Sequence, residues 1–139
     1  MSIEAGANTL WAKGGQIDEA IHRFTVGQDP VTDLQLLTHD CVGSAAHARM
    51  LAAVGLLTDA DALALVGGLK RIHDLAEAGA FPIPVDLEDA HTAIEAELVR
   101  TLGETGKRIH LGRSRNDQVI LALRLWMREA ALALGAQVA

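Results

Sequence analysis

The sequence predicts an all-α protein, and three observations support this prediction. Half of the 139 residues are hydrophobic but only 3 % are aromatic, so the core must consist mainly of Ala, Leu, Val and Ile. A core of these residues, in a chain with three prolines, favours packed helices over a sheet. Apolar residues also recur at the three- and four-residue spacing of helices. The chain is long enough for one domain with a substantial core.

Charge and composition exclude several classes of partner. The formal net charge of −6 argues against nucleic acid, because binding to phosphates needs a basic face. Cys41 is the single cysteine, so a disulfide framework is absent and a reducing compartment is expected. The sequence shows neither a signal peptide pattern nor an apolar stretch of membrane-spanning length. We therefore expect a cytoplasmic protein with no nucleic-acid or membrane partner.

The N-terminal part predicts an extended arm and a short helix. Residues 1–15 are small and polar, and we expect them to form the arm. Gln16–Phe24 has apolar residues at helical spacing. Residues 26–30 (VGQDP) should end this helix, because Pro30 disfavours a helical conformation at Asp29. The apolar face of the short helix would consist of Ile17, Ala20, Ile21 and Phe24.

Two longer helices follow. One is predicted over Val31–Val54, with Gly55 suited to the position after its end. Thr58 and Asp61 have the spacing of a capping box, and the helix that they open should stop at Gly79. An extended connector is then expected at residues 81–84 (FPIP). The buried face of the first of these helices would contain Leu34, Leu37, Cys41, Ala45, Ala48 and Ala52.

The last third predicts two helices joined by a loop. Leu87–Leu98 has acidic residues in its first turn, where the helix dipole favours them. We expect residues 103–112 to form a loop. The segment from Asn116 is apolar nearly all round, as in a helix buried within a bundle, and still runs at Ala139. We expect further chain or another subunit to complete its packing. The buried stripe of the earlier helix would be Ala90, Ile94, Leu98 and Leu102.

The segment around Arg113 is the strongest candidate site. Ser114 and Asp117 have capping-box spacing, so a helix should begin here with amide donors unpaired. These donors, the positive end of the helix dipole, Arg113 and Arg115 could together bind an anion. The alternative from the residues alone is a solvated basic helix start.

Other polar residues also allow two interpretations. His91, with Asp89 and Glu95 nearby, could belong to a surface pair or face a substrate. The polar pattern at 39–40, 43–44 and 47 is interpreted as packing and solvated-face residues.

Two other kinds of site, a phosphate-binding loop and a metal site, are not supported by the sequence. The run GETGK at 103–107 lacks the first glycine and the Ser or Thr of a phosphate loop, and a helix precedes it where a strand is needed. The six histidines show no metal-binding spacing, so we expect no metal.

The motifs taken in order resemble those of the argininosuccinate lyases, within the fumarase/aspartase superfamily. The similarity runs over nearly the whole chain, and GRSRNDQ after an EDxH helix is highly specific. The matching elements are Leu10-Trp11, Phe24, Asp40, GSAAHA at 43–48, GLL at 55–57, EDxHxxIE at 88–95, GRSRNDQV at 112–119 and RLW at 124–126.

This resemblance implies a cytoplasmic homotetramer without a cofactor that cleaves argininosuccinate into arginine and fumarate. Residues 1–113 would be the N-terminal helical domain, and residues 114–139 the opening helix of the central bundle. The catalytic acid and base would lie outside this chain, so we expect the chain alone to be inactive.

The resemblance also implies substrate-binding residues. Ser114, Arg115 and Asn116 would hold the fumarate-side carboxylates, with Arg113 shaping the loop. Asp89 and His91 would line the same cleft. In many family members a substrate-contacting serine follows the Phe24 position, and the alignment places Asp29 there. Leu111 stands where the family usually has threonine before GRSRND.

Two alternatives belong to other functional classes. A non-catalytic structural or assembly protein could retain the lyase fold, and the loss of a hydroxyl at Leu111 leaves this possible. The other alternative is an unrelated helical interaction module. The intact GRSRND motif argues against this alternative.

Overall fold

The computed structural model describes residues 18–84 and 87–138, and the described residues form helices without a strand. The predicted all-α fold is confirmed. The predicted arm at residues 1–15 lies outside the described residues. The helices in chain order are α1 (Glu19–Val26), α2 (Asp29–Asp33), α3 (Leu37–Ala53), α4 (Asp59–Glu77), α5 (Ala90–Leu102), α6 (Glu104–Lys107), the short 3₁₀ helix η2 (Arg108–His110) and α7 (Arg115–Val138).

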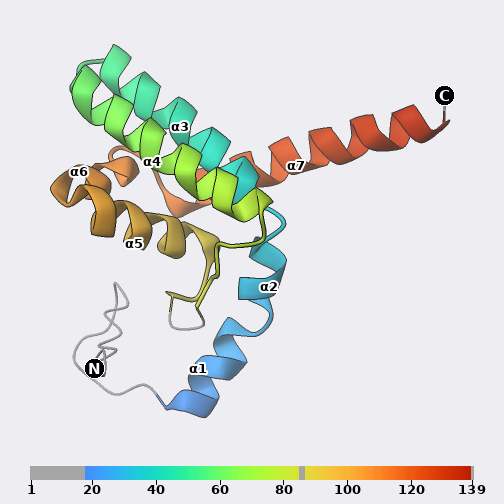
Figure 1. Cartoon of the computed structure of the whole chain (residues 1–139). Coiled ribbons are helices and arrows are strands. Elements are labelled where there is room, and N and C mark those ends of the chain that lie inside the picture. The colour runs from blue at the N-terminus through green and yellow to red at the C-terminus, as the bar shows by residue number, and fades with distance from the viewer. Residues whose placement is uncertain (1–17, 85–86, 139) are drawn as a thin grey trace.

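Helices α3 and α4 form an antiparallel hairpin, in the upper part of Figure 1, that contacts both α5 and α7. The left-handed φ of +77° at Gly55 turns the chain after α3. Thr58 then caps α4, since its hydroxyl accepts the Asp61 backbone N–H at 3.1 Å. The predicted capping box at the start of α4 and the predicted C-terminal ends of α3 and α4 therefore match the structure.

Helix α5 packs against this hairpin and completes the core (Figure 1). Its predicted stripe is confirmed, with Ala90, Ile94 and Leu98 buried and Leu102 half-buried. The extended connector before it brings Phe81 and Ile83 into the same core. The largest fully buried side chains are Leu37, Leu51, Leu65, Leu69, Ile72, Ile94, Leu98 and Ile109.

The segment after α5 is helical rather than the loop that the sequence predicts. Helices α6 and η2 fold back against the end of α5, and a Cβ at Gly106 would lie only 2.4 Å from the Leu98 carbonyl oxygen. A residue without a side chain permits this close backbone approach.

Helix α7 crosses α3 and contacts it as far along as Glu129, which lies 2.8 Å from His39, and its last turns project away from the other helices (Figure 1). Gln118 and Ala122 are its buried residues among those described. Gly43 on α3 allows the crossing, because a Cβ there would lie 2.8 Å from the Leu121 side chain. The rest of α7 exposes apolar side chains to solvent, among them Ile120, Met127, Leu132 and Leu134.

Two predictions about the N-terminal helices are wrong. The single helix expected over Val31–Val54 is divided into α2 and α3 by a turn at residues 34–36. Asp29 is the first residue of α2 rather than being outside a helix, because proline is accepted in a first helical turn and Pro30 takes that place.

The apolar face predicted for the first helix is also not buried against the core. Ile21 and Phe24 are 61 % and 87 % exposed, while Ile17 lies outside the described residues. No helix in the described part of the chain is long and apolar enough to cross a membrane.

Candidate functional site

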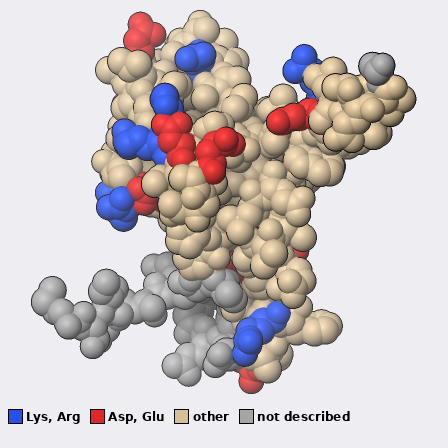
Figure 2. Space-filling model, turned by 45° about the vertical axis from the view of Figure 1, so that its right-hand side comes forward, with Lys and Arg blue, Asp and Glu red and all other residues tan. Residues whose placement is uncertain are grey.

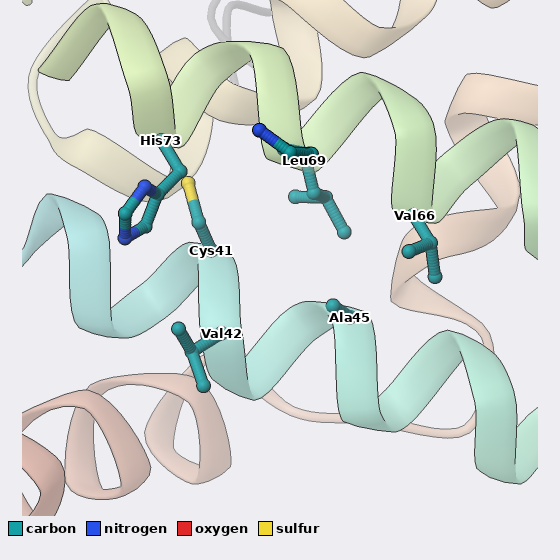
Figure 3. A pocket seen from close by; sticks show the side chains of 7 residues that line it. Cys41, Val42, Ala45, Val66, Leu69 and His73 are labelled. Carbon is teal, nitrogen blue, oxygen red and sulfur yellow. The ribbon is translucent and has the colours of Figure 1, made fainter.

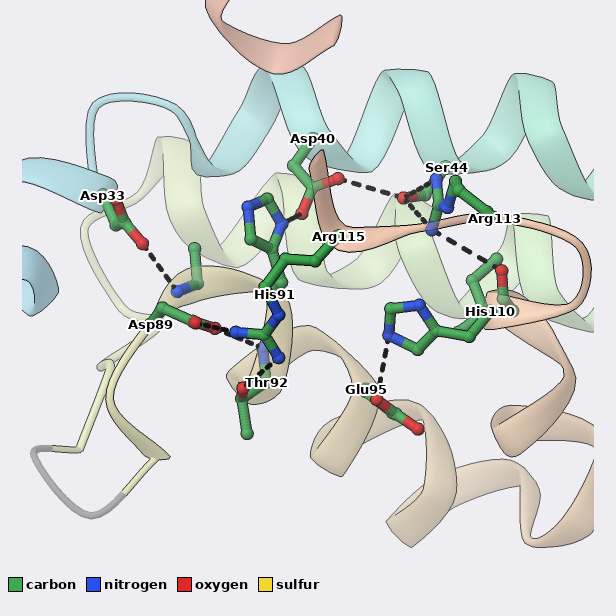
Figure 4. A network of polar contacts seen from close by, with 12 residues as sticks. Asp33, Asp40, Ser44, Asp89, His91, Thr92, Glu95, His110, Arg113 and Arg115 are labelled. Carbon is green, nitrogen blue, oxygen red and sulfur yellow. Dashed lines mark hydrogen bonds and ion pairs between the residues drawn. The ribbon is translucent and has the colours of Figure 1, made fainter. Parts of the chain in front are cut away.

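A chain of buried polar side chains connects α5, α3 and the segment before α7 (Figure 4). His91 Nδ1 lies 2.5 Å from Asp40 Oδ2, and the Ser44 hydroxyl donates to Asp40 Oδ1 at 3.1 Å. The Arg113 guanidinium donates to Ser44 Oγ from both terminal nitrogens at 3.2 Å. Asp40 is 2 % exposed and Ser44 is 0 % exposed, so these hydrogen-bonded polar side chains form part of the protein interior.

Arg113 is held in an environment that is unusual for a cation. Burial lowers its pKa, while the Asp40 and Asp117 carboxylates oppose this shift. Its Nε is buried without a hydrogen-bond partner in the described part of the chain. An arginine nevertheless keeps its charge in proteins, so Arg113 brings a positive charge to the base of this segment.

A second link joins the starts of α5 and α7. Asp89 caps α5, because its Oδ1 accepts the Thr92 backbone N–H at 2.8 Å. Its other oxygen accepts from the Arg115 guanidinium, which also donates to the Thr92 hydroxyl at 3.1 Å. Asp89 and Arg115, both predicted to bind substrate, therefore bind each other in this structure (Figure 4).

The start of α7 has the predicted capping box. Ser114 Oγ accepts the Asp117 backbone N–H at 3.3 Å, and Asp117 accepts the Ser114 N–H at 3.0 Å. The hydrogen bonds from the Ser114 N–H and hydroxyl lower the pKa of Asp117. Ser114 and Asn116 are exposed, and the Asn116 backbone N–H donates to no described residue. This helix start can therefore offer donors to an anion.

Two histidines fix the segment that leads to Arg113. His110 Nε2 lies 2.9 Å from Glu95 Oε2 on α5, and His47 Nε2 on α3 donates to the Leu111 carbonyl at 2.9 Å. Burial lowers the pKa of His47, which favours the neutral ring. The segment is thus attached to two helices and presents Arg113 and Ser114 from a fixed backbone.

The turn before α5 contains a backbone conformation that is rare outside glycine. Glu88 has a φ of +66°, and its carboxylate lies 3.3 Å from His22 Nε2 of α1. Asp33 of α2 accepts the Ala90 backbone N–H at 3.0 Å. Helices α1 and α2 therefore both contact the turn that carries Asp89.

The structure brings most of the predicted residues together. Arg113, Ser114, Arg115 and Asn116 follow one another at the start of α7, with Asp89 and His91 facing this region from α5 (Figure 4). The interpretation of His91 as a surface residue is wrong, since only 7 % of the residue is exposed. Asp29 is exposed at the start of α2, and Asp33, one turn later, makes the contact with α5.

The polar network also includes Asp40, Ser44 and Thr92, which the sequence patterns did not predict as members of a site. Asp40 and Ser44 are four residues apart and so share one helix face next to the buried Leu37. A carboxylate and a hydroxyl at this spacing beside an apolar stripe were the available signal. The pattern gave no indication of which polar residue would face Asp40.

A pocket between α3 and α4 is a weaker candidate (Figure 3). Cys41, Val42 and Ala45 line it from α3, and these residues lie on a different face of that helix from Asp40 and Ser44. Burial, with a smaller contribution from Asp40, raises the pKa of the Cys41 thiol to about 12. The thiol therefore stays protonated and is not an activated nucleophile.

The charged surface does not form a basic patch on the face that Figure 2 shows, where blue and red side chains are interleaved. Lys107 lies 2.5 Å from Glu104, and Arg108 lies 2.9 Å from Asp61. Residues 18–84 and 87–138 contain no cluster of three His, Cys, Asp or Glu side chains that could hold a metal ion.

Comparison with known proteins identifies the family to which the chain belongs. A family model described as lyase matches residues 12–138. Argininosuccinate lyase of Phocaeicola vulgatus is 48 % identical over 122 residues, which are 88 % of this chain and 27 % of the relative. The Pseudomonas aeruginosa PAO1 argininosuccinate lyase is 49 % identical over 133 residues, covering 93 % of this chain and 28 % of that protein.

A third argininosuccinate lyase, from Thermotoga neapolitana, is 46 % identical over 120 residues, or 86 % of this chain and 30 % of the relative. The chain thus spans less than a third of the length of these relatives. Its helices have the fumarase/aspartase fold of the matching family. The chain is a member of the lyase family.

Proposed function

We propose that this chain supplies part of the substrate-binding site of an argininosuccinate lyase. The observation that carries the proposal is the start of α7, where Arg115 binds Asp89 and where Arg113 is linked to His91 through Ser44 and Asp40. The similarity to argininosuccinate lyases supports it, since nearly half of the aligned residues are identical.

The chemistry of the substrate suits this helix start. Argininosuccinate carries three carboxylates, and exposed Asn116 can donate hydrogen bonds to one of them. The Ser114 hydroxyl donates to Asp117 in this structure and would turn from Asp117 to the carboxylate when the substrate binds. Arg113 and Arg115 place two positive charges behind these donors, and the dipole of the 24-residue α7 adds to them. We assign Ser114, Arg115 and Asn116 to carboxylate recognition and Arg113 to holding the backbone of the segment. A role for Asp29 stays a prediction.

The reaction itself is a β-elimination. A base removes a proton from the succinyl carbon, the electron pair forms the new C=C bond, and the C–N bond to the guanidino nitrogen breaks. That nitrogen takes a proton and leaves as arginine, while the carbon part leaves as fumarate. The donors at α7 would stabilise the negative charge that develops on the neighbouring carboxylate. We assign the acid and base to segments outside this chain.

We further propose that the protein acts in the cytoplasm, in arginine biosynthesis, as a homotetramer. The exposed apolar side chains along α7 support association, because a surface of this kind favours contact with other helices. Residues 114–139 would then open the central bundle, and residues 1–113 would form the N-terminal domain.

Reconstitution tests the proposed function. The chain is mixed with the part of the Pseudomonas aeruginosa argininosuccinate lyase that remains after removal of the segment matching this chain; we call the product the reconstituted complex. We expect the complex, but neither part alone, to release fumarate from argininosuccinate. A complex that assembles without producing fumarate would instead support the non-catalytic structural role.

A further inference from the structure

Asp40 is a carboxylate that no substrate can reach, yet it contacts two parts of the candidate site. Its side chain is 2 % exposed. Oδ2 lies 2.5 Å from Nδ1 of His91, and Oδ1 accepts the Ser44 hydroxyl at 3.1 Å. A carboxylate accepts hydrogen bonds, so each oxygen selects a donor on the group that faces it.

The contact with His91 determines which ring nitrogen carries a proton. Since Asp40 accepts, Nδ1 must donate and therefore bears the hydrogen. The other tautomer would place the Nδ1 lone pair against the carboxylate. Nε2 forms no hydrogen bond with a described residue, and the side chain of His91 keeps an exposed fraction of 8 %. Nε2 is thus the ring atom left for a ligand.

The contact with Ser44 extends the same arrangement to Arg113. An arginine only donates, so the two Arg113 nitrogens at 3.2 Å make the Ser44 oxygen an acceptor. The single hydroxyl proton of Ser44 is then directed to Asp40. One carboxylate on α3 consequently orients a ring on α5 and a guanidinium just before α7.

We propose that Asp40 is a positioning residue of the lyase site. The Asp40 carboxylate holds His91 as the Nδ1–H tautomer, and it holds Arg113 through the Ser44 hydroxyl. The proposal rests on the proposed function, because it assumes that His91 and the start of α7 meet one substrate. Asp40 acts through these two side chains and does not touch the ligand.

The ring tautomer is measured first, by ¹⁵N NMR of the His91 imidazole in the 139-residue chain. The wild-type chain should show the Nδ1–H form, and Asp40→Asn should populate the Nε2–H form, because an amide accepts less strongly and can itself donate. Cys41→Ala is the matched control, since Cys41 lies on α3 and is as buried as Asp40 but forms no hydrogen bond with Asp40, Ser44, His91 or Arg113. It should lose packing and keep the wild-type tautomer.

Activity of the reconstituted complex is the second measurement. Asp40→Asn should lower kcat/KM by about ten- to a hundredfold, the effect expected from a misplaced hydrogen bond to a charged group. Cys41→Ala should stay within about twofold of wild type. An unchanged tautomer in Asp40→Asn overturns the positioning role at any level of activity. A changed tautomer with no more loss than in Cys41→Ala overturns it too.

Ser44→Ala keeps the proposal testable if Asp40→Asn does not fold. This variant removes the link to Arg113 and leaves Asp40 bound to His91. It should raise KM and preserve the Nδ1–H tautomer, whereas an unchanged KM contradicts the role in holding Arg113. Absence of activity in the wild-type reconstituted complex would contradict the proposed function itself, a result separate from the tautomer measurement.

Discussion

The carboxylate of Asp89 joins α5 and α7 by binding both the first turn of its own helix and the guanidinium of Arg115. One oxygen accepts the Thr92 N–H at 2.8 Å, and the other accepts from Arg115, 26 residues later in the chain. The residue therefore combines a helix cap with a tertiary ion pair, and these two roles can be separated by substitution.

Asp89→Asn should cost less stability than Asp89→Ala. Asparagine caps helices about as well as aspartate, so the first variant removes only the charge of a partly exposed pair, worth about 1 kcal/mol or less. Alanine also removes the cap, which adds about 1 kcal/mol. The free energy of unfolding in urea measures both variants. Equal losses in the two variants would show that the cap contributes nothing.

Gly106→Ala should destabilise the fold by about 1–3 kcal/mol, because the added Cβ would overlap the Leu98 backbone carbonyl. Gly67→Ala is the matched control inside α4, where a Cβ meets nothing within 4 Å. This control should gain about 0.5–1 kcal/mol from helix propensity. Thermal or urea unfolding compares the two, and a neutral Gly106→Ala would mean that α6 does not pack tightly on α5.

Asp61 should make stability depend on pH in the acidic range. Hydrogen bonds from Thr58 and then Thr105, with the charge of Arg108 as a smaller cause, lower its pKa in the folded chain. A lowered carboxyl pKa gives a contribution that is present above the unfolded pKa of about 3.9 and is lost as pH falls through the folded pKa. Asp61→Asn should therefore lose less stability than wild type between about pH 5 and pH 3.

The control for this pH measurement is Asp59→Asn. Asp59 lies in the same first turn of α4, and its carboxylate forms no hydrogen bond with a described residue. It should keep the wild-type pH dependence. The same slope in all three chains would contradict the assigned role of Asp61.

Cys41 should react slowly with thiol reagents in the folded chain. Burial raises its pKa to about 12, so the reactive thiolate is scarce near neutral pH. Labelling should accelerate when urea unfolds the chain and exposes the thiol. Labelling of the folded chain at the rate of a free cysteine would show that α3 and α4 do not enclose this residue.

Local patterns predicted much of the fold. The Thr58 and Ser114 caps, the turn at Gly55 and the buried stripe of α5 depend on neighbours within one helix, and sequence spacing reports such neighbours. The turn at residues 34–36 and the helical α6 were missed. Gly106 fits against Leu98 only once α5 is in place, so tertiary packing decides the structure there.

The candidate site was predicted less completely than the fold. The motif at the start of α7 identified Arg113–Asn116, but it gave no sign that Arg115 would bind Asp89. Nor did it show that Asp40 would orient His91, because these residues lie 51 positions apart on different helices. Pairings of this kind depend on how helices cross, which periodicity along one helix does not report.

The central claim is that the start of α7 recognises the substrate, and Asn116→Ala in the reconstituted complex tests it most directly. Asn116 is exposed and its side chain binds no described residue, so its removal should leave assembly intact. We expect kcat/KM for argininosuccinate to fall by at least about tenfold, as for a lost hydrogen bond to a carboxylate. Arg128→Ala, an exposed change further along α7, should retain wild-type kcat/KM. Full activity of Asn116→Ala, or an equal loss in both variants, would contradict the claim.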